Sequence, residues 1–124
     1  MLAPLTRVIL YVKDVERSAA FYALHFGFSV QRSPSDRITE LVPADGGTRL
    51  LLHKAGKAQK LGQVAVKLVF DVKDISGFCE MAKSHGLVFG SPHQADGYQF
   101  ANAKDPDGNS LQVSSRACRQ MATD

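Results

Sequence analysis

Short hydrophobic segments alternate with polar turns along the chain, and their periodicity predicts mixed helix and strand structure. Residues 7–12 are rich in β-branched and aromatic side chains, which favours a strand. Asp14 follows as an N-cap, and apolar residues at helical spacing continue to Gly27, which ends the predicted helix. Further strands are predicted at residues 28–32, 38–42 and 49–53.

The same order of elements begins again about sixty positions later. Residues 12–15 read Val-Lys-Asp-Val, and residues 72–75 read Val-Lys-Asp-Ile. Because each tetrapeptide follows a predicted strand and opens a predicted helix, the repeat indicates two modules of one architecture. The second module is predicted to hold a helix from Asp74 to Gly86, a loop at 91–96, and strands at 64–72, 87–89, 98–103 and 110–115.

We therefore expect a single α+β domain, residues 1–124, made of two βαβββ modules. Module one covers about residues 5–54, a polar linker covers 55–62, module two covers about 63–116, and 117–124 form a loose tail. One face of each sheet must lie under its own helix. Two sheets that curve toward each other would cover the remaining faces, and this predicts a half-barrel cleft.

Composition adds few constraints. The net charge is +3, but the basic residues are scattered, so we expect no nucleic-acid partner. No apolar run is long enough to cross a bilayer and the first residues do not resemble a signal peptide, so we expect a cytoplasmic protein with no membrane partner. Cys79 and Cys118 lack metal or redox spacing and are expected to be inert thiols.

Several of these motifs resemble a known group of proteins. Residues 7–15 read Arg-Val-x-Leu-x-Val-x-Asp-Val, Ser18, Phe21-Tyr22 and Gly27-Phe28 follow, and residues 105–109 read Asp-Pro-Asp-Gly-Asn. Together with the paired βαβββ order, they resemble the vicinal oxygen chelate superfamily, which contains glyoxalase I, bleomycin-resistance proteins and extradiol dioxygenases. The resemblance covers about residues 5–115 and implies the fold more strongly than any one activity.

The metalloenzymes of that superfamily imply four ligand positions in this chain. The first, usually His, falls on Arg7, and its counterpart in module two falls on Lys67. The last-strand position, usually Glu, falls on Gln112, and the module-one position falls on Leu50 or Leu51. Arginine and a charged lysine offer no lone pair to a cation. The resemblance therefore implies a member without a bound metal or other cofactor.

Strand parity predicts which side chains line the expected cleft. Alternate residues of each strand face away from the helix, and the predicted ligand-binding residues are Arg7, Ile9, Tyr11, Leu51, His53, Lys67, Val69 and Gln112. His53 ends its strand and either lines the cleft or lies at its rim, as surface histidines do. Arg7 and Lys67 either contact an anionic ligand or form ion pairs with Glu40 or Asp71.

These observations favour a metal-free protein that binds an anionic or neutral aromatic small molecule, and the resemblance implies a homodimer. The alternative is a metal-dependent lyase, isomerase or dioxygenase of the same superfamily. An enzyme that uses Tyr11, Lys67 or Asp71 without metal, and an interaction module with a vestigial pocket, remain open. The sequence shows no nucleophile–base pair, so no catalytic residue is predicted.

Overall fold

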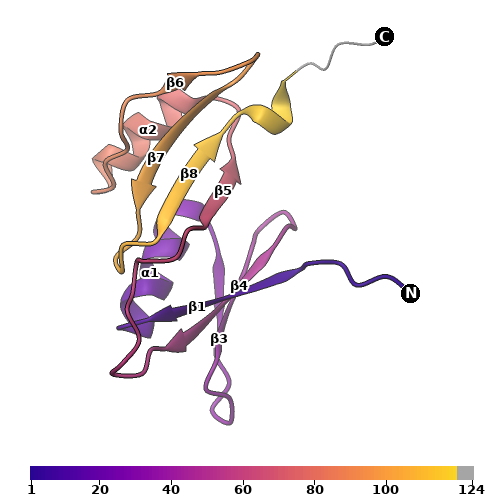
Figure 1. Cartoon of the computed structure of the whole chain (residues 1–124), viewed down its shortest axis with the longest axis vertical. Helices are drawn as coiled ribbons and strands as arrows, with labels where there is room; N and C mark the ends of the chain where they lie inside the picture. The colour runs from indigo at the N-terminus through magenta and orange to yellow at the C-terminus, as the bar shows by residue number, and fades with distance from the viewer. Residues whose placement is uncertain (120–124) are drawn as a thin grey trace. The chain divides into compact units, whose positions relative to one another are not determined.

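The computed structural model describes residues 1–119, and the chain divides into two compact units (Figure 1). The first unit is Met1–Leu61 and the second begins at Gly62. The boundary lies within the stretch 55–62 that the sequence marks as a linker. Neither helix among residues 1–119 has the length and hydropathy needed to cross a bilayer.

The first unit is a four-stranded mixed sheet with one helix. Its strands lie in the order β1-β4-β3-β2, where β1 pairs with β4 in parallel and the other pairs are antiparallel. Its elements are β1 (Arg7–Val12), α1 (Val15–Phe26), β2 (Ser29–Gln31), β3 (Thr39–Val42) and β4 (Arg49–Lys54). The helix contacts β2, β3 and β4, so it covers one face of the sheet.

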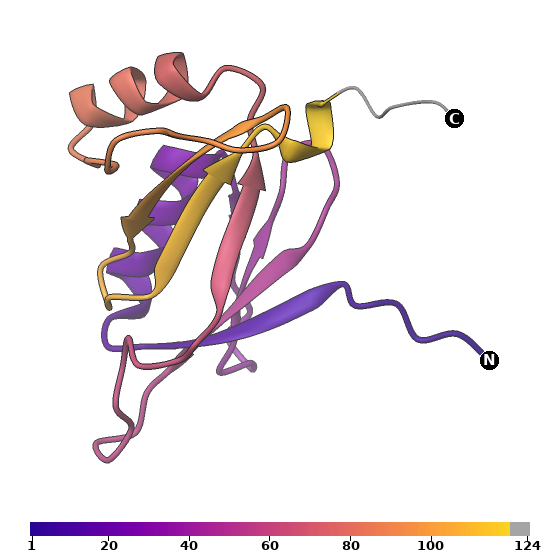
Figure 2. The same cartoon turned by 45° about the horizontal axis from the view of Figure 1, so that its top comes forward.

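The second unit repeats this topology, with strand order β5-β8-β7-β6 and a parallel β5·β8 pair. Figure 2 shows β5, β8 and β7 side by side. The elements are β5 (Lys67–Asp71), α2 (Ile75–Ser84), β6 (His93–Gln94), β7 (Gln99–Lys104), β8 (Ser110–Ser114) and a 3₁₀ turn, η1 (Arg116–Cys118). The predicted α+β class and the two βαβββ modules are confirmed.

The repeated Lys-Asp motifs act as helix N-caps in both units. The carboxylate of Asp14 accepts a hydrogen bond from the backbone N–H of Arg17 at 3.1 Å, and Asp74 accepts one from Gly77 at 3.0 Å. Each bond satisfies a donor that the first helical turn leaves unpaired. Gly27 ends α1 with φ of 73°, a backbone conformation that glycine adopts without strain.

Burial alternates along the strands as predicted. Val12, Leu50 and Leu52 are buried on the helix side of the first sheet, and Leu111 and Val113 are buried in the second. The opposite faces stay open, because Ile9, Tyr11 and Val69 are 47%, 44% and 54% exposed. Each unit therefore has a packed core on one side of its sheet and an accessible surface on the other.

Three predictions in the second module were wrong. Residues 87–89 form no strand. Leu87 is buried and Phe89 packs edge-on against Phe78 of α2 with ring centroids 6.0 Å apart, so these side chains contribute to the core without pairing in the sheet. The sixth strand lies instead within the predicted loop, where His93 and Gln94 pair with β7. Residues 64–66 precede β5 rather than forming part of it.

The expected loose tail begins with ordered structure. Arg116–Cys118 form the 3₁₀ turn η1, and the backbone N–H of Arg119 donates to the carbonyl of Arg116 at 3.3 Å. Residues 120–124 lie outside the described residues.

The start of the second unit packs directly against the turn between β7 and β8. Gly62 has φ of 71°, and a Cβ atom built there would lie 2.7 Å from the backbone oxygen of Asp107. In the turn itself, Asp105 is 5% exposed and accepts hydrogen bonds from the backbone N–H groups of Asp107 and Asn109. The side-chain amide of Asn109 adds a third bond at 2.9 Å. The predicted tight turn is thus held by its own aspartate.

Candidate functional site

The predicted site residues of the first unit share the open face of its sheet. Parallel pairing places Arg7 beside Arg49, Ile9 beside Leu51, and Tyr11 beside His53. Leu50 points to the opposite side, where it is 3% exposed. The module-one position that the sequence left between Leu50 and Leu51 therefore reaches the open face only at Leu51.

Arg7 forms an ion pair on this face, which was one of the two alternatives for that residue. Its Nε donates to Oε1 of Glu40 at 3.0 Å, and Nη1 of Arg49 donates to Oε2 at 3.0 Å. The hydrogen bond from Arg7, assisted by Arg49, lowers the pKa of the Glu40 carboxyl below its ordinary value. Two guanidinium groups thus share one carboxylate, which leaves one positive charge in excess.

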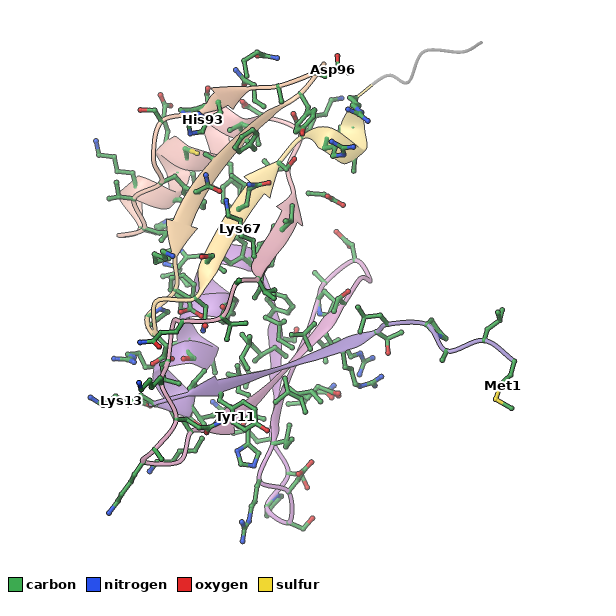
Figure 3. The ribbon with its side chains drawn as sticks, in the orientation of Figure 1. Met1, Tyr11, Lys13, Lys67, His93 and Asp96 are labelled. Atoms are coloured by element: carbon green, nitrogen blue, oxygen red, sulfur yellow. The ribbon has the colours of Figure 1, made fainter. Side chains whose placement is uncertain are left out.

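Tyr11 and His53 form the aromatic part of the same face. Their ring centroids are 5.4 Å apart, with the planes tilted by 51°. The side chain of Tyr11 is labelled in Figure 3. Nδ1 of His53 lies 2.9 Å from the carbonyl oxygen of Lys54, so this nitrogen carries the proton when the ring is neutral. Arg7, Ile9, Tyr11, Leu51 and His53 therefore lie on one surface, apolar in its middle row and polar at both ends.

In the second unit, Lys67, Val69 and Gln112 also share the open face. Val69 pairs with Gln112, which in turn pairs with Asn102. Oδ1 of Asn102 accepts hydrogen bonds from Nζ of Lys67 at 3.1 Å and from Nε2 of Gln112 at 3.0 Å. Lys67 is labelled in Figure 3. Its partner is a neutral amide, and neither of the acids proposed from the sequence pairs with it.

These side chains do not fit a divalent metal ion. Arg7 and Lys67 are cations at two of the four implied ligand positions, Leu51 is apolar, and Gln112 directs its amide N–H at Asn102. Among residues 1–119, no group of three or more His, Cys, Asp and Glu side chains lies close enough to hold a metal. No catalytic step through a metal follows from this arrangement.

The remaining histidines and the cysteines are spread over separate elements. His25 packs against Phe21 on α1 with ring centroids 4.8 Å apart, and His93 stacks on Phe100 at 5.1 Å. His85 is the C-cap of α2. Cys79 and Cys118 are free thiols, and burial raises the pKa of Cys79. These contacts give the three histidines packing and capping roles.

A pocket of about 510 Å³ lies on the open face of the second unit, toward the C-terminal ends of β5 and β8. It includes Val69 and Gln112, which the sequence predicted. It also contains Asp71 and Ser114, which strand parity directs to the same face, and residues that sequence reasoning missed, namely Tyr98, Arg116, Ala117 and Arg119. The i, i+3 spacing of Arg116 and Arg119 was the available signal, because a 3₁₀ turn places such residues on one side.

Comparison with known proteins identifies the family. The model of the Glyoxalase/Bleomycin resistance protein/Dioxygenase superfamily matches residues 5–113. The chain therefore belongs to this superfamily, as the motifs in the sequence implied. The Bacillus subtilis (strain 168) protein YetH, described as uncharacterized, is 29% identical over 114 residues, which are 88% of this chain and 95% of YetH.

Solved structures show the same fold at lower identity. The crystal structure of UcmS2 is 22% identical, covers 93% of this chain and 99% of its own, and gives a TM-score of 0.79. TnmS3, an antibiotic binding protein from Streptomyces sp. CB03234, is 22% identical with a TM-score of 0.74, covering 90% of this chain and 94% of its own. These structures establish the architecture, which in this superfamily is shared by proteins of different activity.

Proposed function

We propose that this protein is a metal-free binding protein for a small anionic or neutral aromatic molecule. The observation that best supports this proposal is the environment of Lys67. This residue occupies an implied metal-ligand position and donates a hydrogen bond to the neutral amide of Asn102. Its hydrogen-bond partner carries no negative charge that would offset the ammonium group. The charge sits beside the exposed apolar side chain of Val69, which suits a ligand with an anionic group and an apolar body.

The charges of the first unit also favour an anionic or neutral ligand over a cationic one. Arg7 and Arg49 share the single carboxylate of Glu40, and their excess positive charge lies on the face that also carries Tyr11. A cationic ligand would be repelled by the cations of either open face. Antibiotic binding by TnmS3 supports small-molecule binding as a role for the fold, and it says nothing about the ligand of this chain.

We also propose that the protein acts as a cytoplasmic homodimer. Ile9, Tyr11 and Val69 are large apolar side chains on open sheet faces, and a second copy or a ligand would shield them from water. Sedimentation equilibrium tests this proposal, because a monomer at all concentrations would contradict it.

A thermal-shift comparison of three similar probes tests the binding proposal. Benzoate, benzyl alcohol and benzylamine carry negative, neutral and positive groups on the same ring. At ten times its Kd, a ligand adds about 1.4 kcal/mol to the free energy of unfolding, which raises Tm by a few degrees. We expect benzoate and, more weakly, benzyl alcohol to raise Tm, and benzylamine to leave it unchanged.

The variant Lys67→Ala should lose most of the benzoate effect, and the double variant Arg7→Ala, Lys67→Ala should lose all of it. Equal Tm shifts in the wild type and the double variant would contradict the proposal. Elemental analysis after incubation with zinc, nickel, manganese and iron tests the metal-free part. Stoichiometric, tightly held metal would overturn it and favour an enzyme of the same superfamily.

A further inference from the structure

The pocket of the second unit contains a pair of arginines that are already held in place. Nη1 of Arg116 donates to the hydroxyl of Tyr98 at 3.0 Å, and Nη1 of Arg119 donates to the carbonyl oxygen of Asp96 at 3.2 Å. Both guanidinium carbons lie near the Tyr98 ring, at 5.3 and 5.4 Å from its centroid. Fixed side chains lose less conformational freedom when a ligand binds.

Both guanidinium groups keep most of their donors for another partner. Each carries five N–H donors in a planar fork that matches a carboxylate. Within residues 1–119, the hydrogen bonds described engage one donor of each side chain, and neither arginine forms an ion pair with an acid of that part of the chain. Two nearby cations that form no ion pair with an acid of these residues favour an anionic partner.

The backbone of this region brings the two arginines together. The N–H of Arg116 donates to Oγ of Ser114, which is 3% exposed, and this bond fixes the start of η1. One 3₁₀ turn later the chain reaches Arg119, whose N–H donates to the Arg116 carbonyl. Side chains three apart in a 3₁₀ turn eclipse one another, so both approach Tyr98 from the same segment.

Asp71 limits the total charge that the pocket can accept. It lines the same pocket as the arginines, and two guanidinium charges with one carboxylate leave a net charge of +1. Val69 and Ala117 supply apolar surface beside these groups. The combination matches a ligand with one negative charge and a flat apolar body, and it disfavours a second negative charge.

We propose that this pocket binds the anionic group of a monoanionic aromatic ligand through Arg116 and Arg119. The inference rests on the proposed function and refines it, because it adds the C-terminal arginines to Lys67 as anion contacts on the same open face and assigns the charge selectivity to Asp71. The ligand class is an aromatic monocarboxylate.

Titration of the ¹⁵N-labelled full chain with sodium benzoate, followed by NMR, tests the assignment. Benzoate up to about 10 mM reaches the millimolar affinity expected of so small a ligand. We expect shift changes at the amides of Tyr98, Gln112 and Arg116. The double variant Arg116→Ala, Arg119→Ala should weaken binding by about tenfold or more, as for the loss of charge-assisted hydrogen bonds.

Lys104→Ala is the matched control for net charge. Lys104 lies on the same sheet at the far end of β7, where its Nζ donates to Oγ of Ser110 at 2.8 Å, and it is not part of the pocket. Its removal should leave the benzoate Kd within about twofold, as expected when only a distant exposed charge changes. An equal loss of affinity in Lys104→Ala and in the arginine variants would overturn the assignment, as would the absence of benzoate shifts in the wild type.

Arg116→Lys separates binding from folding. This variant keeps the positive charge but not the planar fork, so we expect weaker benzoate binding at an unchanged Tm. Unchanged affinity in this variant together with unchanged affinity in Arg119→Lys would contradict a forked contact.

Asp71→Asn tests the selectivity with a second probe, the dianion phthalate. The wild type should prefer benzoate, and the variant should shift the ratio of affinities toward phthalate by about fivefold, the effect of removing one nearby like charge. An unchanged ratio would exclude Asp71 as the selectivity residue.

The outcomes also distinguish this inference from the proposed function. If Lys67→Ala abolishes benzoate binding and the arginine variants do not, the proposed function stands and this assignment falls. If only the arginine variants abolish binding, the assignment stands and the anion contact proposed for Lys67 falls.

Discussion

The two modules share one topology but distribute charge differently on their open faces. In the first, Arg7 and Arg49 are paired with Glu40. In the second, Lys67 is bonded to an amide, and Arg116 and Arg119 contact a tyrosine ring and a carbonyl oxygen. The arginines of the first face are therefore ion-paired with an acid, while these cations of the second face are bonded to uncharged groups. Similar scaffolds have acquired separate electrostatic roles.

The largest expected effect tests whether the cores are equivalent. Leu52 on β4 and Leu111 on β8 are each 0% exposed on the central strand that pairs in parallel with the first strand of its unit. Leu→Ala at either position should lower the free energy of unfolding by about 3 kcal/mol, through lost burial and the remaining cavity. Urea unfolding measures this loss, and NMR signals from each unit report whether both units melt together.

Leu24→Ala is the control, because Leu24 is 58% exposed on α1 and its replacement should cost no more than about 0.5 kcal/mol. If Leu52→Ala melted only the first unit and left the second folded, the modules would be independently stable units. Coincident transitions would show one cooperative structure.

A smaller effect should separate the two turns that join the last strands of each module. Asp105 is buried and accepts three hydrogen bonds within its turn, whereas Asp45, in the corresponding turn, is exposed. Asp105→Ala leaves those donors without their acceptor, and we expect a loss of about 2 kcal/mol. Asp45→Ala should change stability by less than about 0.5 kcal/mol. Equal losses in a urea titration would contradict this difference.

The smallest effect concerns pH and should arise in the first module. The pKa of Glu40 is lowered by Arg7 and Arg49, so its ionised form favours the folded state. That contribution is fully present above the carboxyl's ordinary pKa and is lost as the pH falls through the lowered, folded-state pKa. Urea midpoints measured from pH 7 to pH 3 should fall more steeply in the wild type than in Glu40→Gln.

Glu16 is a second group of the same kind, because its hydrogen bonds with Arg32 lower its pKa as well. Glu16→Gln should therefore flatten the acid side of the profile in the same direction. A profile that keeps its full slope in the double variant would place the acid sensitivity outside these two ion pairs.

Much of the fold was predictable because the repeat and the strand periodicity agree. The Asp14 and Asp74 caps, the parity of β1 and β5, and the turn at Asp105 follow from local chemistry that tertiary structure does not override. The sixth strand was misplaced for a physical reason. Leu87 is buried and Phe89 packs against Phe78 of α2, so this apolar segment resembles a strand, while the paired strand is the polar His93–Gln94 at the sheet edge.

The candidate site was predictable only in part. Parity placed Arg7, Ile9, Tyr11, Lys67 and Val69 on open faces, yet it could not show which cations are neutralised. The contacts of Arg7 with Glu40 and of Lys67 with Asn102 join side chains of different strands, and strand parity does not predict which of them meet. Arg116 and Arg119 were overlooked because the end of a chain is usually loose, and their order comes from a distant partner, Tyr98.

The contact of Gly62 with the β7–β8 turn limits where the chain can be split or circularly permuted. A side chain at this position would collide with the Asp107 backbone, so any rearranged chain must keep glycine at residue 62 to keep its stability. The polar, mostly exposed residues 55–61 carry no such restriction. Split-protein fragments or circular permutants opened at 55–61 should therefore reassemble, whereas those whose new terminus or linker places a residue other than glycine at 62 should lose stability.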